Sequence, residues 1–119
     1  MTEKKLEKQQ WQGFFDRVSK NIAGKRAEIE VASLAIGDQI EAEWLPLLGI
    51  VYDPKDDAVE VLLEGLSHLI RRPREVQVAE SLDGLARVSV VDADDVLHIV
   101  RLRDPLMLPA PAPSASLPA

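Results

Sequence analysis

The 119-residue chain has no cysteine, few aromatic residues and no long apolar run. Without cysteine it has no disulfide bond, no thiolate nucleophile and no cysteine-ligated zinc. No stretch approaches the roughly 18 apolar residues of a transmembrane helix, and the charged start MTEKKLEKQQ lacks the apolar core of a signal peptide. We therefore expect a soluble, cytoplasmic protein that needs no cofactor and contacts no membrane.

Charge is unevenly distributed along the chain. Residues 1–26 hold seven Lys or Arg against three acidic residues, a net charge of +4, whereas the remainder holds seven against seventeen, a net charge of −10. An acidic body repels phosphate backbones, so nucleic acid is not an expected partner.

Apolar residues repeat first at helical spacing and then at strand spacing. Trp11, Phe15, Val18 and Ile22 predict an amphipathic helix over about residues 6–23 that packs on the protein's own sheet. After residue 27 the repeat becomes two, which is typical of strands with one buried face. Strands are expected at residues 27–31, 40–52, 59–63, 68–78, 86–91 and 96–102.

Two prolines interrupt these strands. Pro46 predicts a bend within residues 40–52, and Pro73 splits residues 68–78 in two, so the sheet is expected to curl. The fold class is predicted as α+β, with the helix packed on a strongly bent antiparallel sheet, or small partly open barrel, of five to six strands. Residues 1–8 are interpreted as a charged extension, 9–103 as a single domain and 104–119 as a flexible Pro/Ala-rich tail.

A helix followed by bent strands resembles the Sm-like small barrels. Nucleic-acid binding is therefore an alternative function, although the Gly, Asp and Asn residues of the Sm signature are missing from IEAEW and AVEVLLEG.

A second resemblance covers about residues 10–102. The segments WQGFFDRVS, PLLGIVYDPKDDAVEVLL, HLIRRPREV and VDADD together resemble a family of small uncharacterised bacterial proteins defined only as a domain of unknown function. This resemblance implies an independently folding domain and carries no activity or site residue.

Three arginines beside a histidine form the densest cationic cluster, consisting of His68, Arg71, Arg72 and Arg74. Guanidinium groups pair bidentately with oxyanions, so this cluster is a candidate site for an anionic small molecule. Glutamates in neighbouring strands are the competing partners.

The two histidines and the aspartate runs suggest no reaction. His68 and His98 each lie in an aliphatic strand pattern without a recognised catalytic motif, so we expect a protein that is not an enzyme. The acidic runs at residues 53–57 and 92–95 lack the form of a calcium loop, and we interpret them as turns and predict no metal site.

The remaining candidate surface is an apolar run, comprising Trp44, Leu45, Leu47, Leu48, Ile50 and Tyr52. Such an excess of apolar residues fits either core packing or a protein interface. Because the domain offers long β edges and no catalytic set, we predict a non-enzymatic binding or scaffold module that meets a protein partner or forms a homo-oligomer.

Overall fold

The computed structural model describes residues 2–22, 24–35, 37–82 and 84–104. This part of the chain forms one helix and eight strands, with the bounds Thr2–Leu6 (β1), Lys8–Ser19 (α1), Arg26–Ser33 (β2), Gly37–Asp53 (β3), Ala58–Leu63 (β4), Leu66–Arg71 (β5), Pro73–Ser81 (β6), Gly84–Asp92 (β7) and Leu97–Arg103 (β8). All strand pairs are antiparallel, in the order β1-β6-β7-β8-β2-β3-β4-β5.

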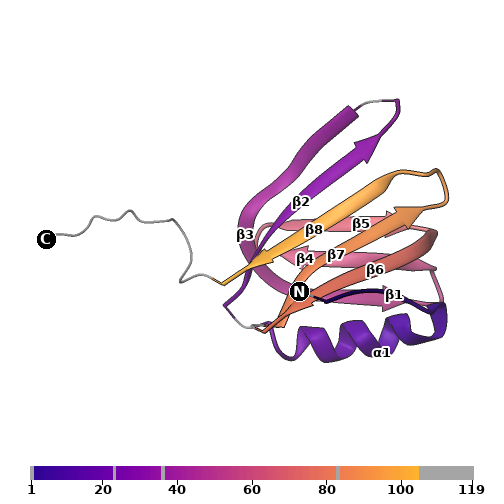
Figure 1. The fold of residues 1–119 in the computed structure, drawn as a ribbon. Helices are drawn as coiled ribbons and strands as arrows, with labels where there is room; N and C mark the ends of the chain where they lie inside the picture. Colours follow the sequence, from indigo (N-terminus) through magenta and orange to yellow (C-terminus); the bar gives the residue numbers. More distant parts are fainter. Residues whose placement is uncertain (1, 23, 36, 83, 105–119) are drawn as a thin grey trace, which may run out of the picture.

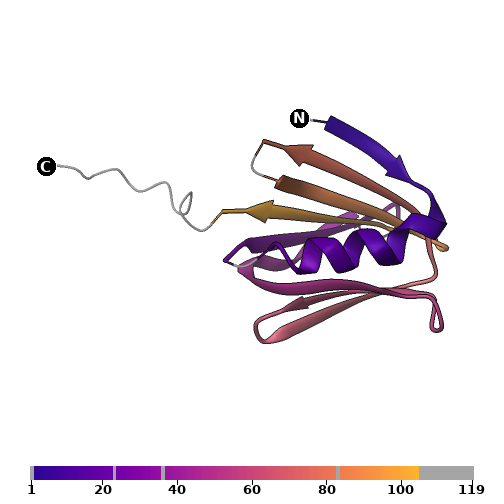
Figure 2. The same cartoon turned by 90° about the horizontal axis from the view of Figure 1, so that it is seen from below.

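Strand β3 belongs to both halves of this sheet. It pairs with β2 as far as Leu45 and Pro46, and from Leu47 onward it pairs with β4. Trp44, at the change of partner, has a φ of 53°, a conformation that bulky residues rarely adopt. The bend predicted at Pro46 is therefore confirmed. It folds the sheet into two layers, with β1, β6, β7, β8 and β2 in one and β4 and β5 in the other (Figures 1 and 2).

The predicted fold class is confirmed in outline, because the protein is mostly antiparallel sheet with one short helix. The expected five to six strands are too few, since the described residues form eight, and the sheet is not closed into a barrel. Pro73 separates β5 from β6 as predicted. The chain changes layers there, after Arg72 adopts a φ of 51°, so β5 and β6 end up far apart in the strand order.

The segment interpreted as a charged extension contains strand β1. Thr2–Leu6 pairs with β6 along its whole length, from Glu80 to Val76. Only Leu6 in this strand is buried, so TEKKL has no period-two apolar pattern, and its strand depends on backbone pairing with β6, which is accompanied by ion pairs such as Lys4 with Glu80 and Lys5 with Glu75. In the segment interpreted as a tail, residues 105–119 lie outside the described residues.

Helix α1 lies along the open side between the two layers (Figure 2). It begins after Glu7, whose backbone N–H donates to Oε1 of Gln10 at 2.9 Å in a capping box. Trp11, Phe14 and Phe15 lie three and four residues apart and are all buried against the sheet. The amphipathic helix is thus confirmed, but it is shorter at both ends than residues 6–23.

Ser19, the last residue of α1, caps an open strand edge. Its hydroxyl donates to the carbonyl oxygen of Ile50 at 2.8 Å and accepts from the N–H of Ile50 at 3.0 Å. Strand β2 pairs with β3 only as far as Pro46, so it leaves the backbone groups of Ile50 without a strand partner on that side. The hydroxyl of Ser19 takes the place of that strand.

We expect Ser19→Ala to lower the free energy of unfolding by about 1–3 kcal/mol, because the partly buried N–H and C=O of Ile50 lose their partner. Urea denaturation measures this. The matched control is Ser89→Ala on the outer face of β7, with an expected change within about 0.5 kcal/mol. Equal losses in the two variants would contradict the capping role.

Candidate functional site

The two histidines, 30 residues apart, meet across the layers. His68 lies on β5 and His98 on β8, and Nε2 of His68 is 3.0 Å from Nδ1 of His98. Nε2 of His98 is in turn 3.0 Å from Oδ2 of Asp92 at the end of β7. The three side chains form one hydrogen-bonded chain that joins β5 to the opposite layer.

Donor and acceptor roles in this chain follow from the carboxylate. Asp92 accepts, so His98 donates from Nε2, and its Nδ1 shares one proton with Nε2 of His68. Oδ1 of Asp92 accepts from the backbone N–H groups of Asp94 and Val96 at 2.9 and 3.1 Å. Asp92 therefore orients His98 and also forms the β7–β8 turn.

Burial and hydrogen bonding shift the pKa values of His68 and Asp92. Burial lowers the pKa of His68, the neighbouring His98 lowers it further, and Glu41 acts in the opposite direction. For Asp92, burial raises the pKa, but the hydrogen bonds from His98 and from the two backbone N–H groups outweigh it and leave the pKa lowered. The lowered pKa of His68 favours the neutral form of that imidazole at neutral pH.

Chemically, such a chain can hold or pass a proton, as in a catalytic triad, where a nucleophile stands at the end. Among the hydrogen bonds of the described residues, none joins His68 or His98 to a hydroxyl. The hydroxyl next in sequence, Ser67 Oγ, donates instead to Oε2 of Glu60. In the structure, the hydrogen-bonded series His68–His98–Asp92 connects the two layers.

The arginine cluster is spread over separate positions. Arg71 lies three residues after His68 on β5. Because side chains alternate between the two faces of a strand, Arg71 points to the opposite face from His68. Nη2 of Arg72 is 3.4 Å from Oδ2 of Asp94, and Nη2 of Arg74 is 2.6 Å from Oδ1 of Asp95. The structure thus brings two of the arginines to the β7–β8 turn, where each pairs with an aspartate.

The aspartate runs form turns. Oδ1 of Asp53 accepts from the backbone N–H groups of Lys55 and Asp56 at 2.9 and 3.4 Å. Among the described residues, no group of three or more acidic or histidine side chains is placed to hold a metal ion.

The six candidate interface residues are divided between the core and the surface. Leu47, Ile50 and Tyr52 are buried, whereas Leu45 is half-buried and Leu48 is 63% exposed. Trp44 is half-buried under the guanidinium of Arg103, whose Cζ is 3.7 Å from the ring centroid.

Sequence reasoning missed two exposed apolar residues on the same face. Val51 on β3 and Leu69 on β5 are 38% and 44% exposed and point away from the core. Consecutive apolar residues, as in VLLEGLSHLI, could have indicated these exposed positions, because they place apolar side chains on both faces of a strand.

A family model described as a family of unknown function, DUF5335, matches residues 2–111. The chain belongs to this family. An uncharacterised protein from Aquifex aeolicus (strain VF5) is 40% identical over 110 residues, which cover 92% of this chain and 99% of that protein. The resemblance to small uncharacterised bacterial proteins is thereby confirmed.

No solved structure matches this DUF5335 chain. Within the part of the chain that the structure describes, no helix is long and apolar enough to cross a membrane.

The lowered pKa of His68 predicts a pH-dependent stability for this DUF5335 protein. In the unfolded chain His68 becomes protonated at about pH 6.5, and in the folded chain it becomes protonated only at lower pH. Stability is therefore fully present above about pH 6.5, falls as the pH decreases towards the folded pKa, and then levels off. Urea denaturation between about pH 8 and about pH 5 measures the slope, which we expect to be smaller in His68→Gln. Identical slopes in the two proteins would contradict this role of His68.

Tyr52 provides a second titration. Burial is the main cause that raises its pKa to about 12. The second cause is the hydrogen bond that its hydroxyl donates to Oδ1 of Asp57 at 2.7 Å. Because Tyr52 is the single tyrosine, alkaline titration of the phenolate absorbance reports this group alone. We expect a midpoint near 12 and a lower midpoint in Asp57→Asn, since the repelling carboxylate is removed while burial remains. Circular dichroism at each pH checks that the protein is still folded, and an unshifted midpoint in the variant would contradict the assignment.

Proposed function

We propose that this protein is a non-enzymatic binding module that acts by strand addition at β5, with a second copy of the same chain as the partner. The observation that supports the proposal is the contrast between the two edge strands of the open sheet, β1 and β5. An edge strand presents unpaired backbone donors and acceptors to any incoming strand unless charges or prolines protect it.

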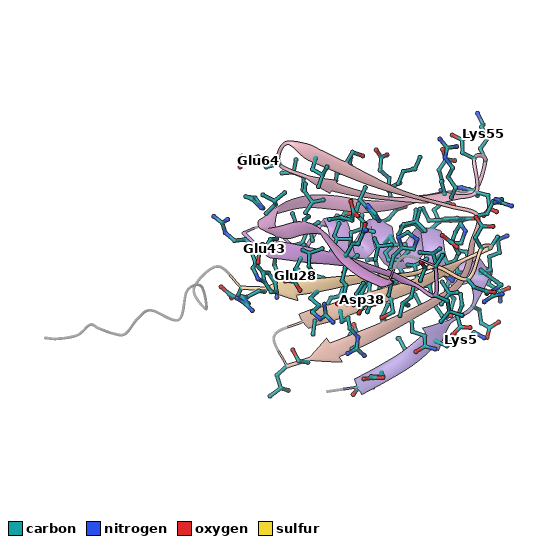
Figure 3. All side chains as sticks on the ribbon, turned by 90° about the horizontal axis from the view of Figure 1, so that it is seen from above. Lys5, Glu28, Asp38, Glu43, Lys55 and Glu64 are labelled. Carbon is teal, nitrogen blue, oxygen red and sulfur yellow. The ribbon has the colours of Figure 1, made fainter. Side chains whose placement is uncertain are left out.

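Strand β1 carries such protection. Its exposed residues include Glu3, Lys4 and Lys5, and Lys5 lies on this outermost strand in Figure 3. Lysine on an edge strand opposes edge-to-edge pairing because a second strand would have to desolvate its ammonium group. The β1 edge is therefore unsuited to adding a strand.

Strand β5 lacks this protection. Its sequence, LSHLIR, has no lysine, proline or acidic residue, and among the described residues it pairs only with β4. Leu66 and Leu69 in this strand are 37% and 44% exposed. The β5 edge therefore combines open backbone groups with apolar side chains.

The outer face beside this edge carries exposed apolar residues on both sides of one glutamate. Register places Val51, Glu60 and Leu69 in one row across β3, β4 and β5. Glu60 accepts a hydrogen bond from Ser67 at 2.5 Å, and Leu48, 63% exposed, lies at the bulge of β3 on the same half of the sheet. A second β5 would continue this face and cover Leu69.

A second copy also suits the charges at the two ends of β5. Antiparallel pairing about a two-fold axis brings the end of β5 at Arg71 beside the start of the partner's β5. Glu64 is exposed in the turn just before that start. The dimer would therefore place an arginine near a glutamate twice, by symmetry.

We expect size-exclusion chromatography with light scattering, over a range of protein concentrations, to give the mass of a dimer at high concentration. Leu69→Lys adds the protection that β1 has, and we expect it to weaken the dimer at least about tenfold, or 1.4 kcal/mol. The matched control is Leu82→Lys, which changes an equally apolar side chain that is fully exposed in the β6–β7 turn.

A monomer mass at every concentration would overturn the proposal. Equal weakening by the two substitutions would overturn it as well, because added charge alone, rather than the β5 edge, would then account for the effect.

A further inference from the structure

A cavity of about 360 Å³ lies between α1 and the β1-β6-β7 end of the sheet. This volume is within the range of about 300–1,000 Å³ that is common for small-molecule sites. None of its described lining residues belongs to β5 or to the His68–His98–Asp92 chain, so it is separate from both surfaces considered above.

The floor of the cavity is apolar. Phe14, Ile22 and Leu85 line it and are themselves 6%, 4% and 8% exposed, so they are firmly held by the core. Val18, one turn of α1 beyond Phe14, is half-buried and lines it as well. A ligand seated here would replace water on apolar side chains, which favours an apolar body.

The rim of the cavity is cationic. The Nζ of Lys4 and the Cζ of Arg17 each lie 6.0 Å from the centroid of the Phe14 ring, so both cations are close to the same aromatic side chain. Lys25 also lines the cavity, and Glu80 is the one acidic residue among the described lining residues. Glu80 is 4.0 Å from Nζ of Lys4, and no carboxylate among the described residues forms an ion pair with Arg17.

We propose that this cavity binds an amphipathic organic carboxylate, such as a medium-chain fatty acid. Its apolar body would lie against Phe14 and Leu85, and its carboxylate would lie between Lys4 and Arg17. A carboxylate at this rim gains charge-assisted hydrogen bonds from the guanidinium of Arg17.

The class of ligand follows from the combination of floor and rim. A neutral hydrocarbon would make no ionic contact with Lys4 or Arg17, and a small hydrophilic anion would leave the apolar floor in contact with water. A polyanion would meet Glu80 at the rim and the net charge of −10 carried by residues after position 26. The inference is independent of dimer formation at β5.

Isothermal titration calorimetry of the full chain with octanoate tests the proposal. We expect one saturable site, with acetate and octanol each binding at least about tenfold more weakly because each lacks one half of the ligand's chemistry. Arg17→Gln is expected to weaken octanoate binding by about tenfold, since the exposed arginine is lost while the apolar floor remains.

The matched control is Arg72→Gln, which removes an exposed arginine paired to Asp94 at the other end of the molecule. We expect it to leave octanoate binding unchanged. A second variant, Val18→Phe, fills the cavity from α1 and is expected to abolish binding, with circular dichroism confirming that it folds.

Three results would overturn the proposal. These are no heat of binding at millimolar octanoate, equal affinity for octanol and octanoate, or equal weakening by Arg17→Gln and Arg72→Gln. Retained octanoate binding in Leu69→Lys separates this test from that of the dimer.

Discussion

The change of partner within β3 is the constraint on which the rest of the molecule depends. A flat eight-stranded sheet would expose one apolar face entirely, so this chain buries it by folding the sheet over itself at Trp44 to Leu47. The unfavourable φ of Trp44 is held from both sides, because the Arg103 guanidinium stacks on its ring and Nη1 of Arg26 donates to its carbonyl oxygen at 3.1 Å. Strain at one residue is thus offset by contacts from two other strands.

Folding a sheet in this way leaves two open sides, and different groups cover them. On one side α1 fills the opening with Trp11, Phe14 and Phe15, and Ser19 satisfies the β3 backbone where β2 has left it. On the other side a polar chain of His68, His98 and Asp92 connects the layers. β5 has no strand partner on this side. Two histidine side chains can bridge the layers there, because each places its ring nitrogens farther from the strand than a backbone group lies.

The distribution of charge follows the same architecture. Basic residues of the first 26 positions lie on the edge strand β1 and around the cavity under α1, where Lys4 and Arg17 are both close to the Phe14 ring. Four arginines from later in the chain, Arg72, Arg74, Arg87 and Arg101, form ion pairs with carboxylates, and Arg101 lies 3.2 and 2.9 Å from those of Glu28 and Glu30. The concave basic surface is therefore built from the N-terminal segment and not from the arginine-rich segment around residue 72.

The sequence by itself determined the helix, most strands and the two bends, because apolar spacing and proline act locally. It did not indicate β1, whose formation depends on backbone pairing with β6, 70 or more residues away, rather than on any apolar pattern. Tertiary structure alone decided that His68 meets His98, that Arg71 faces away from His68, and that Leu47 is buried while Leu48 is exposed. Each of these depends on strand register, on the β3 bulge or on which layer a strand joins, and those are set by contacts between residues distant in the chain.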